Sequence, residues 1–431
     1  MTMSAEIPEP LAHPEVLEAP TATFLTIRSR VSTRRLGTAF FIVGLSWVFA
    51  NSMASSTLFA AKIAILDPTN KVGVLAVATA LAGVVSTLAL FFWGAISDLT
   101  RSRLGKRTPW IIFGAVSGAV GLVLIGVSNS VGGLLAAFLG YCLLYNALPA
   151  AVLAVFPDRI PREKRGTTSA IYGGAQVIGG AVAGIIASQF ISNPNPLFFV
   201  ASGVILVGGL LFVVLAPDFS SKDEPRQRLD LRGLAESFKF PADAPDFYWA
   251  FAGRFLLLLG LFMVQNFQLY ILTDYIGLTN DEAGTILALG GFASLITIVI
   301  GIFVAGPLSD KIKRRKMPIF IASLLFGVAV FIPLLSPTGT AMIIFAAVSG
   351  LGLGAFLSVD TALMTEVLPS EESRGKDLGI LNTANTVPAI IAPLITAGIV
   401  GIGLGYVPVF IGSLIVIIIG AFSIFMIKSV R

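Results

Sequence analysis

Few residues in this chain combine a titratable side chain with an apolar setting. Asp360 and Arg254 each lie inside a long apolar run, and Asp274 closes the run that contains Arg254. Charges deep in an apolar medium are costly and usually have a function, and burial favours the protonated form of a carboxylate. Asp360 is therefore the expected proton-coupling group, with Arg254 as its opposing charge. The alternatives are a static Asp360–Arg254 pair that closes a gate and, as the proton acceptor, Asp274, whose position also suits a helix-end anchor.

Amide and aromatic side chains recur inside several apolar runs. Gln265 and Gln268 are three residues apart and would share one face of a helix. Amides offer both donors and acceptors to hydroxyl groups, and aromatic rings can stack on the apolar face of a sugar ring. For each residue, contact between helices or anchoring at the membrane interface is the alternative role. The expected substrate-contacting residues are Trp47, Asn51, Tyr141, Tyr145, Asn146, Tyr172, Gln176, Gln265, Asn266, Gln268, Tyr270, Asn382 and Asn385.

Catalytic and metal-binding patterns do not emerge from the sequence. Cys142 is the only cysteine and lies in an apolar run, and the only histidine, His13, lies near the N-terminus. No spacing suggests a metal site, and there is no glycine-rich phosphate-binding loop. We therefore expect neither an enzyme nor an ATP-driven pump, and no cofactor or metal.

The composition is that of a membrane protein. The 431-residue chain is 55% hydrophobic and only 12% charged, whereas about a quarter of the residues in soluble proteins are charged. Apolar runs of about 20 residues can cross a bilayer as helices, which satisfy their own backbone groups. We predict an all-α protein with twelve transmembrane helices in two pseudo-symmetric six-helix bundles. The expected spans are 36–62, 71–97, 110–127, 133–157, 167–190, 196–216, 247–273, 281–306, 317–336, 339–364, 376–399 and 406–427.

The expected organisation has four parts. Residues 1–35, rich in proline and acidic residues, form a disordered cytoplasmic tail. The first bundle covers 36–216, and the polar central loop covers 217–246 on the cytoplasmic side. The second bundle, with a short cytoplasmic tail, covers 247–431.

Basic residues fall on one side of these spans. Of the 29 lysines and arginines, all except Lys62, Lys71 and Arg254 lie in the tails, the central loop or loops on the same side. The positive-inside rule assigns this side and both termini to the cytoplasm. The formal charge of +5 therefore reflects topology and not nucleic-acid binding. We expect a multi-pass protein in the cell membrane, with the lipid bilayer as its surroundings.

One loop sequence occurs in each half. Residues 94–110 read GAISDLTRSRLGKRTPW and residues 306–318 read GPLSDKIKRRKMP. A second pair, DRIPREKRG at 158–166 and EVLPSEESRG at 366–375, follows the fourth and tenth spans. Basic residues alone would suffice to keep these loops on one side of the membrane. The acid that recurs in both copies therefore favours a gating contact, in which it would bind a nearby cation or helix end. The glycine would allow two helices to approach closely. The expected gating residues are Gly94, Asp98, Arg101, Arg103, Gly105, Lys106, Arg107, Asp158, Arg165, Gly306, Asp310, Glu366 and Arg374.

These features resemble the major facilitator superfamily over nearly the whole chain past residue 35. The resemblance implies two parallel six-helix halves with a substrate site between them, which is one architecture of secondary transporters. A finer resemblance, in DLTRSRLGKRTP at 98–109, TDYIG at 273–277 and VDTALMTEVLP at 359–369, is to glycoside–pentoside–hexuronide:cation symporters and sucrose:proton symporters. The chain departs from both groups, because Leu99 replaces a common basic residue and the second and fourth spans lack their coupling acids.

The resulting expectation is proton-coupled symport of a sugar or glycoside, with Na⁺ as the other candidate coupling ion. The alternative is a proton-coupled antiporter that exports amphipathic compounds. Such antiporters tend to carry a Gly-Pro pair in the fifth span, whereas GGAQVIGGAVAG at 173–184 has glycines without proline. A non-transporting sensor is a third alternative, against which the amides on several spans argue. We expect a monomer that binds a small polar substrate and no nucleic acid.

Overall fold

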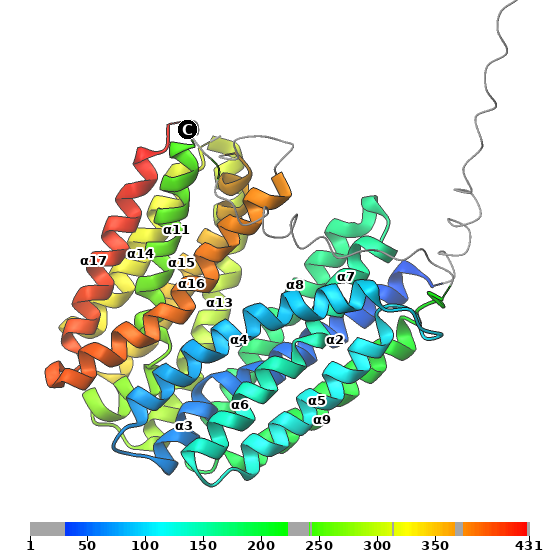
Figure 1. The fold of residues 1–431 in the computed structure, drawn as a ribbon. Helices are drawn as coiled ribbons and strands as arrows, with labels where there is room; N and C mark the ends of the chain where they lie inside the picture. The colour runs from blue at the N-terminus through cyan, green and yellow to red at the C-terminus, as the bar shows by residue number, and fades with distance from the viewer. Residues whose placement is uncertain (1–30, 223–240, 242–243, 313, 367–373, 429–431) are drawn as a thin grey trace, which may run out of the picture.

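The structure is a computed structural model in which the regular elements of the described residues are helices (Figure 1). It describes residues 31–222, 241, 244–312, 314–366 and 374–428. Within these ranges, the side chains at 162–163, 310, 361–362, 365–366, 374–376 and 378–379 are not described. Among the described residues, twelve helical spans are long and apolar enough to cross a membrane, which confirms the predicted fold class.

Six spans form the first bundle, and two of them are divided into two helices. The first and fourth spans are the divided ones. The elements are α2 (Thr33–Ser55) with α3 (Thr57–Leu66), α4 (Lys71–Leu99), α5 (Thr108–Val127), α6 (Val131–Tyr145) with α7 (Ala147–Arg159), α8 (Arg162–Ser188) and α9 (Asn195–Leu215).

The second bundle contains the other six spans, and the seventh span is the most irregular. It consists of a long helix, a single short turn and a π-helical segment. The elements are α11 (Pro245–Gln265) with α12 (Gln268–Tyr270) and η2 (Ile271–Tyr275), α13 (Asn280–Ile312), α14 (Lys316–Leu335), α15 (Gly339–Glu366), α16 (Arg374–Ile399) with η3 (Val400–Leu404), and α17 (Val407–Ser423) with η4 (Ile424–Met426).

Local sequence signals set several helix starts. α5, α9, α11 and α17 each carry proline in the first turn, where the missing N–H leaves no helical bond unmade. The side chains of Ser32 and Ser130 cap α2 and α6 by accepting hydrogen bonds from the backbone N–H groups of Arg35 and Gly133. These starts are therefore encoded by residues close to them in the chain.

Glycines allow close packing within each bundle. A Cβ atom on Gly179 of α8 would lie 2.5 Å from the carbonyl oxygen of Leu45 on α2. A Cβ on Gly354 of α15 would lie 2.1 Å from the carbonyl oxygen of Ile298 on α13. Helix association in lipid depends on such close approach because lipid supplies no hydrophobic drive between helices. The pairs α2–α8 and α13–α15 are therefore held by backbone contact.

The two bundles meet through α4 with α16 and through α8 with α13. Figure 1 shows them lying together near α3 and diverging toward the end at which α7 ends and α8 begins. That end carries the basic loops, and we call it the basic end. We call the opposite end, at which α3 ends and α4 begins, the contact end. At the contact end, Gly284 of α13 packs so closely on α8 that a Cβ would lie 2.2 Å from the Ser188 carbonyl oxygen.

Candidate functional site

Side chains join the bundles at the contact end. The hydroxyl of Tyr270 on α12 donates a hydrogen bond to the carbonyl oxygen of Ala60 on α3 across 2.9 Å. The ammonium of Lys71, at the start of α4, lies 2.6 Å from the carboxylate of Asp274 in η2 and 5.0 Å from the ring centroid of Tyr270. Tyr270 and Asp274, predicted for substrate contact and proton coupling, are therefore inter-bundle contacts in this conformation.

The second bundle buries an ion pair between the two charges that the sequence singled out. Nη1 of Arg254 on α11 lies 3.1 Å from Oδ2 of Asp360 on α15. Nε of Arg254 donates to Oδ1 of Asn385 on α16 across 2.7 Å. Asp360 is only 3% exposed, and its Oδ1 atom has no hydrogen-bond partner among the described residues. The cluster ties three helices of one bundle together and leaves one carboxylate oxygen for a proton or a ligand.

The seventh span is interrupted where its amides occur. α11 ends at Gln265 and α12 begins at Gln268, and Asn266 and Phe267 separate the two helices. Gln265 and Asn266 are exposed, Gln268 is half-buried, and the three amide side chains make no hydrogen bond with the described residues. Broken helices occur in transporters where the backbone and nearby side chains face a polar cavity. The position suits the binding of a polar solute.

Aromatic and amide side chains of the first bundle bond to one another. Nε1 of Trp47 on α2 donates to the hydroxyl oxygen of Tyr172 on α8 across 3.0 Å. The hydroxyl of Tyr145 on α6 donates to Oδ1 of Asn51 on α2 across 2.9 Å, and the Tyr145 ring stacks on that of Tyr141 at 4.4 Å. These residues, predicted to contact the substrate, also hold α2, α6 and α8 together.

Asn146 lies at the break in the fourth span, where α6 and α7 meet. Its side chain is 5% exposed and donates to the backbone carbonyl of Cys142. The hydroxyl of Tyr141 is buried without a hydrogen-bond partner among the described residues. By contrast, Gln176 on α8 is half-buried and Asn382 on α16 is exposed, and neither amide bonds to a described residue.

Arg107 is the centre of a polar cluster at the basic end of the first bundle. Its Nη2 atom lies 2.6 Å from Oδ1 of Asp98 and 3.1 Å from Oδ2 of Asp158, and its Nη1 donates to Ser97 across 2.7 Å. Arg107 is 7% exposed, whereas the side chains of Asp98 and Asp158 are 52% and 40% exposed. One arginine thus brings together the two predicted gating acids of α4 and α7, within a single bundle.

Gly105 turns the loop that precedes Arg107. Its φ angle is +91°, and a Cβ there would lie 2.1 Å from the carboxylate of Asp218, so the position favours glycine. Asp218, just after α9, accepts a hydrogen bond from the backbone N–H of Arg107 across 3.1 Å. Asp218 and Ser97 were not among the predicted gating residues. Ser97 does lie in the repeated pattern, where Ser309 takes its place in the second copy, whereas Asp218 is distant from the loop in the sequence.

The other predicted basic residues of the gating loops are arranged differently. Arg165 donates from Nε and Nη2 to two backbone carbonyls near the end of α7, each across 3.0 Å. Arg101 and Arg103 are exposed and Lys106 is half-buried. Arg103 makes no side-chain bond within the described residues. Arg165 therefore fixes the turn between α7 and α8. Arg103, which forms no hydrogen bond or ion pair with a described residue, is a suitable arginine for control substitutions.

The predicted glycines of the two loops lie in open surroundings. A Cβ on Gly94 would meet no atom within 4 Å, and one on Gly306 would lie at an ordinary 3.7 Å from Ser358. The close helix approach expected at Gly94 is therefore absent from this conformation. The side chains of Asp310, Glu366 and Arg374, also predicted for gating, lie outside the described part of the structure.

Lys62 is a buried charge that is not among the predicted site residues. It is 3% exposed, and its ammonium donates to the carbonyl of Gly126 across 2.9 Å and to Oδ1 of Asn195 across 2.5 Å. These bonds join α3 to the end of α5 and the start of α9. A lysine near the end of a predicted span is typical of an anchor at the membrane interface. Its two bonding partners are distant in the sequence and are seen only in the fold.

Several solved structures are similar to this fold. A bacterial homologue of the human lysosomal transporter Spinster, in an inward-facing and unoccupied conformation, has a TM-score of 0.67 and 15% identity, and the match covers 92% of this chain and 97% of that one. The nucleoside transporter NupG has a TM-score of 0.72 and 13% identity, with 91% and 99% covered. A POT family transporter in complex with 5-aminolevulinic acid has a TM-score of 0.68 and 13% identity, with 91% and 95% covered.

These identities show likeness of fold alone. No curated protein matches the sequence. The family model described as Major Facilitator Superfamily matches residues 36–273 and 250–430, which is nearly the whole chain. The chain therefore belongs to the major facilitator superfamily.

Proposed function

We propose that this protein is a secondary transporter that works by alternating access and couples proton movement to symport of a sugar or glycoside. The first bundle, 36–216, would rock against the second, 247–428, around a substrate site near the membrane midplane. The basic end would face the cytoplasm. The protein would act as a monomer in the cell membrane.

The observation that carries the proposal is the Arg254–Asp360–Asn385 cluster. One oxygen of Asp360 faces Arg254, and the other has no partner among the described residues. A proton on the free oxygen would cancel the charge that holds Arg254 and would weaken the link between α11 and α15. Arg254 would then be free to strengthen its contact with Asn385 or with a substrate hydroxyl. Proton loading would in this way alter the packing of the bundle.

The amides at the break in the seventh span support a polar solute. Gln265, Asn266 and Gln268 belong to the same span as Arg254, and their side chains make no hydrogen bond with the described residues. Amides match the mixed donors and acceptors of sugar hydroxyls. The exposed Asn382 on α16 and the half-buried Gln176 on α8 would add contacts from two further helices.

The contacts between the bundles support alternating access with this conformation open toward the basic end. Tyr270–Ala60 and Lys71–Asp274 close the contact end, and the hydroxyl of Ser192 adds a bond to Asp281 across 3.1 Å. Opening the contact end requires all these bonds to break. We infer that the open surroundings of Gly94 at the basic end would fill in the opposite conformation.

The test is uptake into proteoliposomes with an imposed inward proton gradient, with and without a protonophore. The panel contains labelled mono- and disaccharides and glycosides, with a nucleoside and 5-aminolevulinic acid added because structural neighbours are described with them. Protonophore-sensitive accumulation of one sugar is the expected result. Accumulation that depends on a Na⁺ gradient and is insensitive to the protonophore would show that Na⁺, and not the proton, is the coupling ion.

The exporter alternative has its own outcome in the same preparation. If liposomes that contain folded protein accumulate no member of the panel, dye efflux driven by a proton gradient is measured next. Efflux with no sugar uptake would contradict symport and establish the antiporter. Uptake of a sugar without dye efflux would exclude the antiporter alternative.

A further inference from the structure

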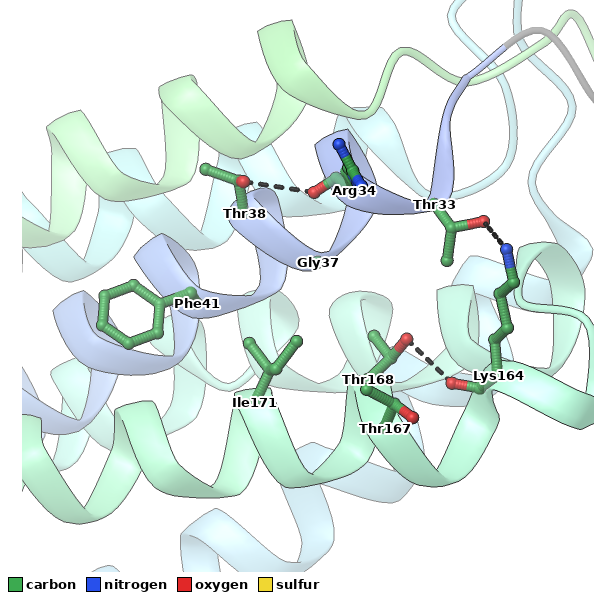
Figure 2. Close-up of a pocket in the computed structure, with 9 residues that line it drawn as sticks. All are labelled: Thr33, Arg34, Gly37, Thr38, Phe41, Lys164, Thr167, Thr168 and Ile171. Carbon is green, nitrogen blue, oxygen red and sulfur yellow. Dashed lines mark hydrogen bonds between the residues drawn. The ribbon is translucent and has the colours of Figure 1, made fainter.

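A pocket of about 620 Å³ lies between α2 and α8 at the basic end (Figure 2). Its volume is in the range of about 300–1,000 Å³ that is usual for small-molecule sites. Arg34 and Lys164 line it near the starts of the two helices, and Phe41 and Ile171 line it farther along them. The pocket is therefore lined by cations near the helix ends and by apolar side chains toward the middle of the helices.

Within the described part of the chain, the two cations of the pocket form no ion pair. Arg34 is exposed and forms no ion pair with a described residue, and Lys164 is exposed and contacts only the hydroxyl of Thr33 at 3.5 Å. The hydroxyl of Thr167 also lines the pocket and makes no hydrogen bond within the described part of the chain. Two positive charges line one pocket, so a bound anion would be attracted to both of them.

A second, apolar groove shares one lining residue with the pocket. Phe41 lines both, and the groove, of about 450 Å³, runs between α2 and α9 past Leu45, Val200 and Val207. Val200 and Val207 are 52% and 55% exposed. Exposed valines within a transmembrane helix face lipid, because lipid is the apolar solvent around the protein. None of the residues in the Trp47–Tyr172 cluster lines either cavity.

We propose that this pocket and groove bind one anionic phospholipid. Its phosphate would lie between Arg34 and Lys164, with the Thr167 hydroxyl as a further donor, and an acyl chain would follow α2 and α9 past Phe41. The site lies at the first turns of two transmembrane helices, where lipid headgroups meet the protein and where basic residues attract anionic lipid. A soluble anion would use only the pocket, and a sugar would have no use for the apolar groove.

The test compares variants of the whole purified chain for lipid binding by native mass spectrometry. The probes are dioleoyl phosphatidylglycerol, dioleoyl phosphatidylcholine and glycerol phosphate, which has the headgroup chemistry without acyl chains. The site variant is the double substitution Arg34→Gln with Lys164→Gln. The matched control is Arg103→Gln with Lys222→Gln, because both residues are exposed near the basic end of the first bundle and make no bond with the described residues.

We expect the site variant to bind phosphatidylglycerol about thirtyfold more weakly than the wild type, from the usual contribution of two cations near an anionic headgroup. The control variant should bind as the wild type does. Phosphatidylcholine should bind equally weakly to all three proteins. Equal phosphatidylglycerol affinity in site and control variants, or equal affinity of the wild type for the two lipids, would overturn the proposal.

A second variant tests the groove without changing charge. Gly203 lines the groove, and a Cβ there meets no atom within 4 Å, so Gly203→Leu would occupy the space of an acyl chain. Gly140→Leu on α6 is its control, since Gly140 also has open space. We expect weaker phosphatidylglycerol binding only for Gly203→Leu. Wild-type binding by that variant, or displacement of bound lipid by glycerol phosphate at equal concentration, would show a soluble-anion site instead.

Discussion

Asp360 tests coupling at the scale of one side chain. Asp360→Asn keeps the size of the side chain but removes its titratable group. We expect the variant to lose gradient-driven accumulation and to fall to the equilibration level, while counterflow exchange persists because exchange needs no net proton movement. Both are measured in proteoliposomes. Asp67→Asn, in the loop between α3 and α4, is the control, and normal accumulation by Asp360→Asn would remove Asp360 from coupling.

Gln265 tests substrate contact at the same scale. Its exposed amide at the end of α11 has no partner among the described residues. Gln265→Ala should weaken the apparent affinity about fivefold, as the loss of one hydrogen bond of about 1 kcal/mol implies. The measurement is the concentration dependence of uptake, at equal membrane insertion. Gln227→Ala, in the central loop, should leave the affinity unchanged, and an unchanged value for Gln265→Ala would place the site elsewhere.

The sequence predicts the surroundings of some residues better than those of others. Arg254 and Asp360 are rare charges inside apolar runs, so the sequence predicted that they interact, and the structure places Nη1 of Arg254 3.1 Å from Oδ2 of Asp360. Asn385 was expected to meet the substrate, yet it accepts a hydrogen bond from Arg254. An amide can serve either purpose, and only the distance between α11 and α16 decides which one it serves here.

At the scale of elements, hydropathy predicted the spans but not their breaks. Apolar runs have enough length to identify a membrane helix, and proline and serine marked several starts. Two of the three breaks have a local signal: the Ser56 hydroxyl bonds back to the Ser52 carbonyl, and Pro149 follows Asn146 by three residues. The break at Asn266 has no such signal. Hydropathy averaged over a whole span does not detect such local signals. The break at Asn266 places the amides of the seventh span between α11 and α12.

Arg107 tests how the loop after α4 supports the first bundle. Arg107→Ala would leave Asp98, Asp158 and Ser97 without their shared donor. Since the guanidinium is buried and charge-assisted bonds contribute about 1.5–3 kcal/mol, we expect a loss of about 2 kcal/mol in the free energy of unfolding. Thermal unfolding in detergent would report it as a lower Tm. Arg103→Ala, in the same loop, should leave the Tm unchanged, and equal Tm values for the two variants would contradict the assignment.

At the scale of the whole molecule, Gly284 limits how closely the bundles meet. Gly284→Ala would place a Cβ 2.2 Å from the Ser188 carbonyl oxygen, so α13 must move away from α8. We expect the contact end to open more often. A cysteine at the buried Ala60, in a Cys142→Ser background, should then react faster with a membrane-impermeant maleimide.

Gly291 supplies the matched control on α13. A Cβ there would meet its nearest neighbour, Ile185, at 3.8 Å, so Gly291→Ala should leave the labelling rate unchanged. Equal rates in the Gly284 and Gly291 variants would show that the α8–α13 contact does not govern opening. A slower rate for Gly284→Ala would contradict the expected direction.

The positions of Lys62 and Lys71 also determine where the folded chain can be cut. Trypsin cleaves after lysine and arginine, and these are the two basic residues assigned to the contact end. Lys62 is 3% exposed and hydrogen-bonds to Gly126 and Asn195, and Lys71 forms an ion pair with Asp274. Both lysines are therefore poor sites for the protease. With the basic end inside the cell, trypsin added to intact cells should leave the chain whole. In inside-out vesicles the same protease should cut it at the basic loops, so a digestion pattern reports the sidedness of the protein without a label.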